Sequence, residues 1–227
     1  MPRLFLGSFL SEEQQAAFAR LPEINSKLAS EWHCQIRWVK ATKLHLTWLF
    51  IGHVEETVSL KLTQAAGELL KGLRLECPIS IIFDRLEAWS VRRSPRHVVL
   101  TAGQPSSQFL DLATRLRTGL RQFGAEDAKD QAKKSFLPHI TLMRLSPEAN
   151  RQATLPTHLA ADSTHPLQGH KKKQVDQLDY RDINGLKDLL PLVQNLPAIS
   201  LVESYEQAGS HTYQILKNYP LAANPAD

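Results

Sequence analysis

The chain has 227 residues, 42% of them hydrophobic and 22% charged, which are ordinary proportions for a globular protein. No apolar run reaches the roughly eighteen residues of a membrane-spanning helix, and the N-terminus lacks the apolar segment of a secretory signal. The two cysteines, Cys34 and Cys77, are too few for a disulfide framework and fit no metal-binding spacing. These features exclude membrane and disulfide-stabilised classes, and they predict a cytoplasmic monomer with buried or inert thiols.

Positive charge is concentrated in one part of the chain. The formal net charge is +4, but residues 90–176 contain 14 Lys and Arg against 7 Asp and Glu, a net of +7 that leaves −3 for the rest. Clustered cations gain affinity for polyanions by releasing counterions from phosphates. This asymmetry predicts a polyanionic partner, nucleic acid above all, with a solvated basic surface as the alternative.

Hydrophobic patterning predicts alternating strands and helices. Strands are expected at residues 3–10, 36–39, 43–52, 79–83, 86–89, 98–101, 137–143, 199–205 and 211–216. Helices are expected at residues 11–24, with Ser11 as N-cap, and at residues 55–70, 105–123 and 184–194. Residues 146–176 are polar and rich in Pro and Thr, which indicates an irregular insertion. The whole chain, residues 1–227, is expected to form a single domain of two similar lobes.

A short His-x-Thr pattern occurs twice, each time inside an apolar run: His45 with Thr47, and His139 with Thr141. Chance alone predicts roughly half of one such pattern in a chain with 9 histidines. If each run is a strand, the period of two places the imidazole and the hydroxyl on one face. A single copy could be an ordinary surface histidine, but two copies in matching context favour a functional pair.

The same period assigns the other side chains of the first motif strand to the opposite, buried face. These are Leu44, Leu46, Trp48 and Phe50. The order of elements repeats, and each half of the chain carries one motif. We therefore expect an α+β, bilobal fold of two antiparallel sheets with outer helices, facing each other across a central cleft that brings the two motifs together.

Two imidazoles across a cleft suit phosphodiester transfer, because one can remove a proton from the nucleophile while the other protonates the leaving oxygen. The threonines can donate hydrogen bonds to the non-bridging phosphate oxygens. This chemistry requires no metal and no cofactor. The sequence contains no His-Glu-x-x-His zinc motif, no Gly-rich phosphate loop and no Gly-x-Ser-x-Gly elbow, so zinc hydrolysis, nucleoside triphosphate hydrolysis and esterase chemistry are not indicated.

These residues resemble the 2H phosphoesterases, and among them the RNA 2',3'-cyclic phosphodiesterases, also called 2',5' RNA ligases. The resemblance lies in Arg3-Leu4-Phe5-Leu6, in Trp38 with Leu44-His45-Leu46-Thr47 and Phe50-Ile51-Gly52, in Phe136-Leu137-Pro138-His139-Ile140-Thr141-Leu142 with Arg144, and in Glu203-Ser204 with Tyr213. It covers residues 2–145 well, 146–198 poorly and 199–219 weakly.

The resemblance implies metal-independent hydrolysis of a terminal 2',3'-cyclic phosphate to a 2'-phosphate, with 2',5' ligation in the reverse sense. It implies that His45 is the general acid for the departing 3' oxygen and His139 the base for water. Thr47 and Thr141 carry over as catalytic residues. Arg144 and Phe136 are expected to bind the substrate, which would be an RNA end or a cyclic nucleotide.

The sequence departs from the family pattern at two places. Trp48 stands where the family usually has Leu, on the expected core face, and the insertion at residues 146–176 is longer than usual. Two other functions stay open: a small-molecule cyclic nucleotide phosphodiesterase, and a nucleotide- or RNA-binding module without turnover.

Overall fold

The computed structural model describes residues 3–32, 34–72, 79–91, 94–123, 136–147, 174–178, 183–207 and 210–221. The strands are β1 (Arg3–Phe9), β2 (Cys34–Trp38), β3 (His45–His53), β4 (Ser80–Phe83), β5 (Arg85–Val91), β6 (Ser94–Thr101), β7 (His139–Pro147), β8 (Gln174–Leu178), β9 (Leu192–Asn195), β10 (Ala198–Gln207) and β11 (Ser210–Pro220). The helices are α1 (Glu12–Phe18), α2 (Leu21–Ile24), α3 (Leu28–Glu31), α4 (Glu56–Lys71) and α5 (Ser107–Gly119), with 3-10 turns η1 (Ala41–Lys43), η2 (Arg121–Phe123) and η5 (Lys187–Leu189).

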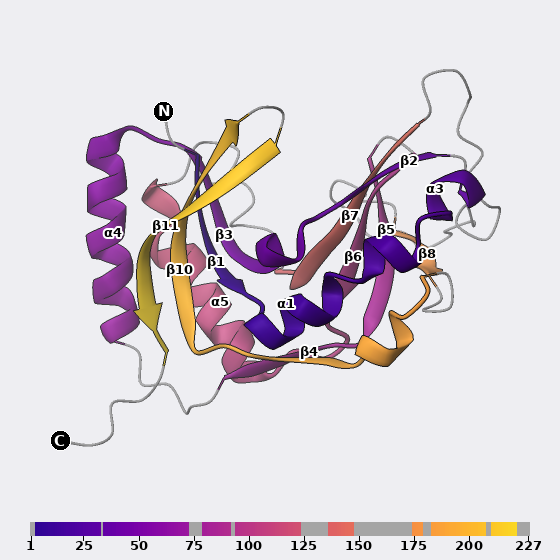
Figure 1. Ribbon diagram of the computed structural model, residues 1–227. Coiled ribbons are helices and arrows are strands. Elements are labelled where there is room, and N and C mark those ends of the chain that lie inside the picture. The colour runs from indigo at the N-terminus through magenta and orange to yellow at the C-terminus, as the bar shows by residue number, and fades with distance from the viewer. Residues whose placement is uncertain are drawn as a thin grey trace.

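The main sheet is antiparallel and consists of two halves that splay apart (Figure 1). The strand order is β11-β10-β1-β3-β7-β6-β5-β8, and β2 also pairs with β7. The halves meet where β3 pairs with β7 through one residue pair, Leu46 and Ile140. The expected α+β fold is therefore confirmed, with the refinement that the two sheets share this junction. His45 is the first residue of β3 and His139 the first of β7. Because these two strands pair at the junction, the two motifs lie close together.

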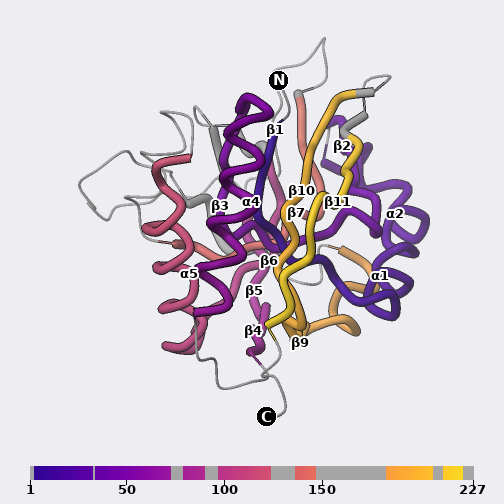
Figure 2. The backbone as a smooth tube through the Cα atoms, turned by 90° about the vertical axis from the view of Figure 1, so that its left-hand side faces the viewer, coloured from indigo at the N-terminus to yellow at the C-terminus, as the bar shows by residue number. Residues whose placement is uncertain are grey.

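Two helices, α5 and α1, pack against the half of the sheet opposite to the strand that each follows in the chain. Helix α5 follows β6 in the chain but contacts β3 and α4, and α4 also contacts β11. Figure 2 shows α4 and α5 side by side, with α1 and α2 on the other side of the molecule. There, Phe18 and Leu21 line an apolar hollow with Trp38 of β2 and Leu142 of β7. This exchange of helices ties the two halves together.

The first predicted helix is interrupted. Ser11 caps α1 through a capping box with Gln14, as expected. The helix ends at Phe18, and α2 begins at Leu21 with a proline in its first turn. Proline lacks the N–H that a continuing helix needs, so it favours a new helix start. Ile24, the last residue of the predicted helix, is 49% exposed.

The chain after the second motif differs more from expectation. The helix predicted at residues 184–194 is instead η5 followed by β9, which pairs with β4 in a separate two-stranded sheet. Pro191 accounts for the break, because it cannot donate to a helical ladder. Strand β7 continues to Pro147 and β8 begins at Gln174, so the ends of the predicted insertion are strands. The rest of the insertion, including the basic run at residues 171–173, lies outside the described residues, as does Cys77; Cys34 is buried.

Both motif strands contain an irregularity at the same place, three residues after the histidine. Gly7 pairs with Thr47 while Leu6 pairs with Leu49, so Trp48 is an extra residue in β3. The same shift occurs in β7, where Leu142 is the extra residue between Thr141 and Met143. A bulge of this kind changes which side chains share a face. The side chain of the fifth residue after each histidine therefore lies on the same face as the histidine and threonine of that motif.

These bulges correct one sequence-based assignment. Phe50 was expected on the core face with Trp48, but it lies on the same face as His45 and Thr47. Trp48 itself is fully buried, as expected, and its indole N–H donates to Ser8 Oγ at 2.9 Å. Trp48, which departs from the family pattern, therefore affects the packing of the core, and its indole N–H has a hydrogen-bond partner.

Candidate active site

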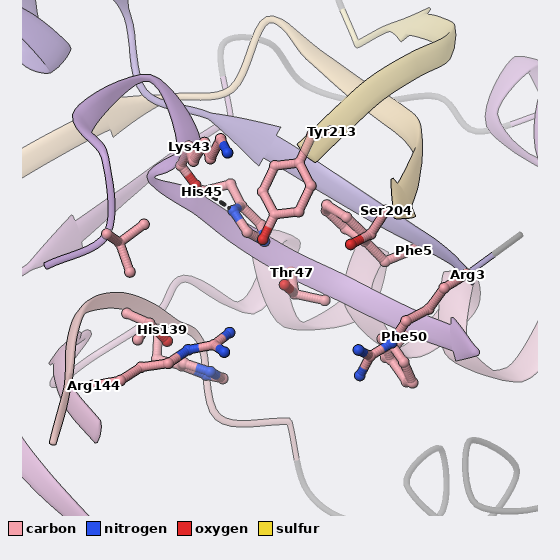
Figure 3. A pocket seen from close by; sticks show the side chains of 12 residues that line it. Arg3, Phe5, Lys43, His45, Thr47, Phe50, His139, Arg144, Ser204 and Tyr213 are labelled. Atoms are coloured by element: carbon pink, nitrogen blue, oxygen red, sulfur yellow. Dashed lines mark hydrogen bonds between the residues drawn. The ribbon is translucent and has the colours of Figure 1, made fainter. Parts of the chain in front are cut away.

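The two motifs open into one cavity of about 200 Å³ at the junction of the halves (Figure 3). It is lined by Arg3, Phe5, Val39, Lys43, His45, Thr47, Phe50, His139, Thr141, Arg144, Ser204 and Tyr213. The structure thus brings together five of the six predicted site residues, although 94 positions separate the two histidines. The expectation that one cleft unites the motifs agrees with this geometry.

Each histidine is held by the same local hydrogen bond. The Nδ1 atom of His45 lies 2.7 Å from the carbonyl oxygen of Lys43, and Nδ1 of His139 lies 2.9 Å from that of Leu137. A carbonyl oxygen can only accept, so Nδ1 carries the hydrogen in both rings. Nε2 is then the atom left for chemistry, and its protonation decides whether each ring acts as acid or base.

His45 lies in an aromatic cage. Its ring centroid is 4.8 Å from that of Phe5 and 5.4 Å from those of Phe9 and Tyr213. Burial in this cage lowers the pKa of His45 below its ordinary value, the hydrogen bond to Lys43 raises it, and the positive charge of Arg144 lowers it further. In the free protein the imidazole is consequently biased towards its neutral form.

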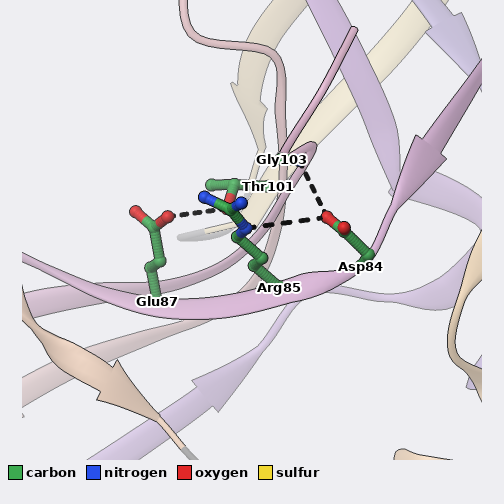
Figure 4. Close-up of polar contacts among 5 residues, drawn as sticks. All are labelled: Asp84, Arg85, Glu87, Thr101 and Gly103. Carbon is green, nitrogen blue, oxygen red and sulfur yellow. Dashed lines mark hydrogen bonds and ion pairs between the residues drawn. The ribbon is translucent and has the colours of Figure 1, made fainter.

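His139 packs against a tryptophan. The ring of Trp89 lies 4.3 Å from that of His139, and its indole N–H donates to Glu87 at 2.8 Å. The other carboxylate oxygen of Glu87 accepts from the hydroxyl of Thr101, also at 2.8 Å, as Figure 4 shows. Glu87 is only 5% exposed. Its carboxylate therefore fixes the aromatic surface on which His139 packs.

Phe136 does not lie in the cavity. Its ring stacks on Phe109 and Trp48, at 5.9 and 6.2 Å, and the guanidinium of Arg117 lies 5.3 Å from it. These partners are on the face of β3 opposite His45. The expected substrate-binding role of Phe136 is therefore replaced by a packing role, in which it covers Trp48.

The sequence-based assignment of site residues omits seven of the twelve described residues that line the cavity. The omitted residues are Arg3, Phe5, Val39, Lys43, Phe50, Ser204 and Tyr213. Alternation along the first strand could have indicated Arg3 and Phe5, which are two residues apart and share a face. No local pattern reveals Phe50, because it depends on the bulge. Tyr213 comes from β11, far along the chain, and reaches the cavity through the pairing of β10 with β1.

The cavity suits an anion. Among the described residues, its wall has three permanent cations, Arg3, Lys43 and Arg144, and no Asp or Glu. Within the described parts of the chain, no group of three or more His, Cys, Asp or Glu side chains could hold a metal ion. Nor does any helix in those parts have the length and apolarity to cross a membrane.

The protonation of His45 gives a first testable prediction. In a titration followed by the imidazole NMR signals, we expect the pKa of His45 to lie below about 6.5, the value for an unperturbed histidine. Arg144→Gln should raise it, because one of the lowering charges is removed. Since the folded pKa is lowered, the stability that this group contributes is present above about pH 6.5 and is lost as the pH falls through the folded pKa. A pKa at or above the ordinary value would contradict the burial of this ring.

A fold of two joined antiparallel half-sheets with a His-Thr pair from each half defines the class of two-histidine, or 2H, phosphoesterases. A model of the family described as "2'-5' RNA ligase superfamily" matches residues 19–172 of this chain. The chain therefore belongs to this superfamily.

Individual relatives agree with this assignment. The chain is similar to the RNA 2',3'-cyclic phosphodiesterase of Bacillus subtilis (strain 168), with 31% identity over 108 residues, which are 48% of this chain and 55% of the relative. The structure is similar to that of TT0787 of Thermus thermophilus, with a TM-score of 0.63, 26% identity and 96% and 97% of the two chains covered. It has the same fold as E. coli LigT complexed with 3'-AMP, with a TM-score of 0.63, 24% identity and 98% and 100% coverage.

Proposed function

We propose that this protein hydrolyses the terminal 2',3'-cyclic phosphate of RNA to a 2'-phosphate without a metal ion. The observation that carries the proposal is the convergence of two His-Thr pairs, each with Nε2 available, on one cationic cavity. The family assignment and the name of the Bacillus relative support the same reaction.

The proposed reaction uses each histidine once. His139 Nε2 takes a proton from water as the water oxygen bonds to phosphorus, the bond from phosphorus to the 3' oxygen breaks, and His45 gives its proton to that oxygen. The Thr47 and Thr141 hydroxyls and the guanidinium of Arg144 bind the non-bridging oxygens as charge develops on them. Proton exchange with solvent then restores both rings. With a 5'-hydroxyl in place of water, the same steps form a 2',5' bond.

The lowered pKa of His45 affects its proposed role as the general acid. As the acid, His45 must hold a proton when the leaving oxygen departs, yet burial favours its neutral form. A bound phosphate anion beside the ring favours the imidazolium. Substrate binding is therefore coupled to proton uptake, and the acid is charged when the cyclic phosphate is in place.

The same cavity is also compatible with a second function, that of a small-molecule cyclic phosphodiesterase. At about 200 Å³ it is smaller than the roughly 300–1,000 Å³ of typical small-molecule sites, so it encloses only part of a ligand, and a cyclic mononucleotide offers the same cyclic phosphate as an RNA end. The two functions are separated by comparing kcat/KM for a cyclic-ended mononucleotide with that for a cyclic-ended ten-nucleotide RNA. Preference for the RNA supports the proposal, whereas equal or lower kcat/KM for the RNA favours the small-molecule function. Absence of turnover of both would contradict both and favour a binding module.

Chelation provides a further prediction. EDTA should leave the rate of cyclic-end hydrolysis unchanged, because the proposed steps move protons between imidazoles and oxygen atoms and require no cation. The rate is measured after dialysis against EDTA, with and without added zinc or manganese. Loss of activity on chelation and its recovery with either ion would contradict the mechanism.

A further inference from the structure

The cavity contains more permanent positive charge than the reacting group requires. A cyclic phosphodiester carries one negative charge, and Arg144 beside the two motifs can neutralise it. Arg3 adds a second guanidinium, and the part of the cavity wall that the structure describes contains no carboxylate. The two ion pairs found within the described ranges, Arg85 with Asp84 and Arg115 with Asp111, involve neither of these cavity arginines. This surplus indicates a ligand with a second anionic group.

Arg3 is fixed on an aromatic surface. Its guanidinium carbon lies 4.8 Å from the centroid of the Phe50 ring, a geometry that stabilises a cation and limits its rotamers. Phe50 occupies the position in β3 that Arg144 occupies in β7, five residues after the histidine and beyond the bulge. Each half therefore supplies one guanidinium: β7 through Arg144 itself, and the first half through Arg3 stacked on Phe50.

The position of Arg3 sets it apart from the reacting centre. In Figure 3, Arg3 and Phe50 lie at one end of the cavity beyond Thr47, whereas Lys43 lies at the other end beside His45 and Tyr213. Lys43 also provides the carbonyl that orients His45, and its ammonium is a point charge on a flexible four-carbon chain, 5.8 Å from the centroid of the Tyr213 ring. Arg3 lies closer to its aromatic ring, at 4.8 Å, and its planar guanidinium can form two parallel hydrogen bonds, so Arg3 is the better candidate for binding a fixed second anion.

Building on the proposed function, we propose that Arg3 binds the internal phosphodiester group that precedes the cyclic end of an RNA chain. Arg144 and the threonines hold the reacting phosphate, and Arg3 on Phe50 holds its neighbour. A planar guanidinium can donate two parallel hydrogen bonds to one phosphate. This arrangement gives the site a preference for an RNA end over a cyclic mononucleotide, which lacks the neighbouring phosphate.

The test removes the two partners separately. Two probes are used: a dinucleotide that ends in a 2'-phosphate, and the same dinucleotide with an uncharged methylphosphonate in place of its internal phosphodiester. Dissociation constants are measured for the unmodified protein and for Arg3→Gln, Arg3→Lys and Lys61→Gln. Lys61 is an exposed cation on α4 outside the cavity, so its replacement is the matched control for loss of one charge.

We expect the unmodified protein and Lys61→Gln to bind the charged probe about tenfold more tightly than the neutral one, as for loss of a charged hydrogen bond. Arg3→Gln should bind both probes equally, and its salt dependence for the charged probe should be shallower by about 0.7 in log K against log salt. Arg3→Lys should keep part of the discrimination. If Arg3→Gln weakens both probes by the same factor, or weakens neither, Arg3 does not bind this phosphate.

Because these probes do not react, their binding is measured independently of turnover. Failure to hydrolyse a cyclic end would contradict the proposed function. The two dissociation constants would still show whether Arg3 binds the internal phosphodiester. Hydrolysis of a cyclic end, together with equal loss of affinity for both probes in Arg3→Gln, would contradict only the role of Arg3.

Discussion

Replacing either His45 or His139 by alanine is expected to lower turnover of a cyclic-ended RNA at least about a hundredfold, because general acid or base catalysis contributes roughly 10² to 10⁴ to a rate. Nε2 of each ring is available for chemistry, and the described residues that line the cavity include no third histidine that could replace either one. The measurement is kcat under saturating substrate, with folding verified by circular dichroism.

Two further variants separate chemistry from packing. His45→Asn keeps an N–H that can donate to the Lys43 carbonyl but removes Nε2, so it should be as inactive as the alanine variant. His53→Ala removes an exposed histidine from the other end of the same strand, outside the cavity, and should retain the normal rate. A folded His45 or His139 variant with a near-normal rate would rule out the two-histidine mechanism.

The threonines should also have large effects. Thr47→Val and Thr141→Val keep the branched shape of the side chain but remove the hydroxyl, and each is expected to lower kcat by about 10² to 10³, the usual cost of losing one donor to a developing oxyanion. Serine at either position should restore most of the rate, because it returns the donor. The rates are measured as for the histidine variants.

Two other kinetic results would contradict a role of the threonines in stabilising the transition state. If the valine variants raise KM and leave kcat unchanged, the hydroxyls bind the ground state and the transition state equally. If neither constant changes, the threonines only line the cavity.

The faces of the motif strands could be predicted from the sequence because alternation is a local property. His45 and Thr47 share a face up to the bulge, and so do His139 and Thr141. The bulges could not be predicted, since they are defined by pairing with strands elsewhere in the chain. The sequence-based assignment of Phe50 to the core face is wrong for this reason.

Other parts of the site depend on contacts that no local pattern contains. The cage around His45 combines rings from β1 and β11, the first and last strands of the chain. Phe136 is expected to bind substrate from the family resemblance, but its ring packs against Trp48 and Phe109 in the core. The helices were predicted well where periodicity was long, as in α4, and poorly near Pro22 and Pro191, where a proline outweighs the apolar pattern.

The most direct test of the proposed reaction is to identify its product. A dinucleotide with a 2',3'-cyclic end is incubated with the protein and EDTA in water labelled with heavy oxygen, and the product is examined by phosphorus NMR and mass spectrometry. The mechanism predicts a 2'-phosphate that carries one labelled oxygen atom from water, formed by the unmodified protein and not by the His45→Asn or His139→Ala variants. A 3'-phosphate, or a 2'-phosphate formed equally by these variants, would contradict it.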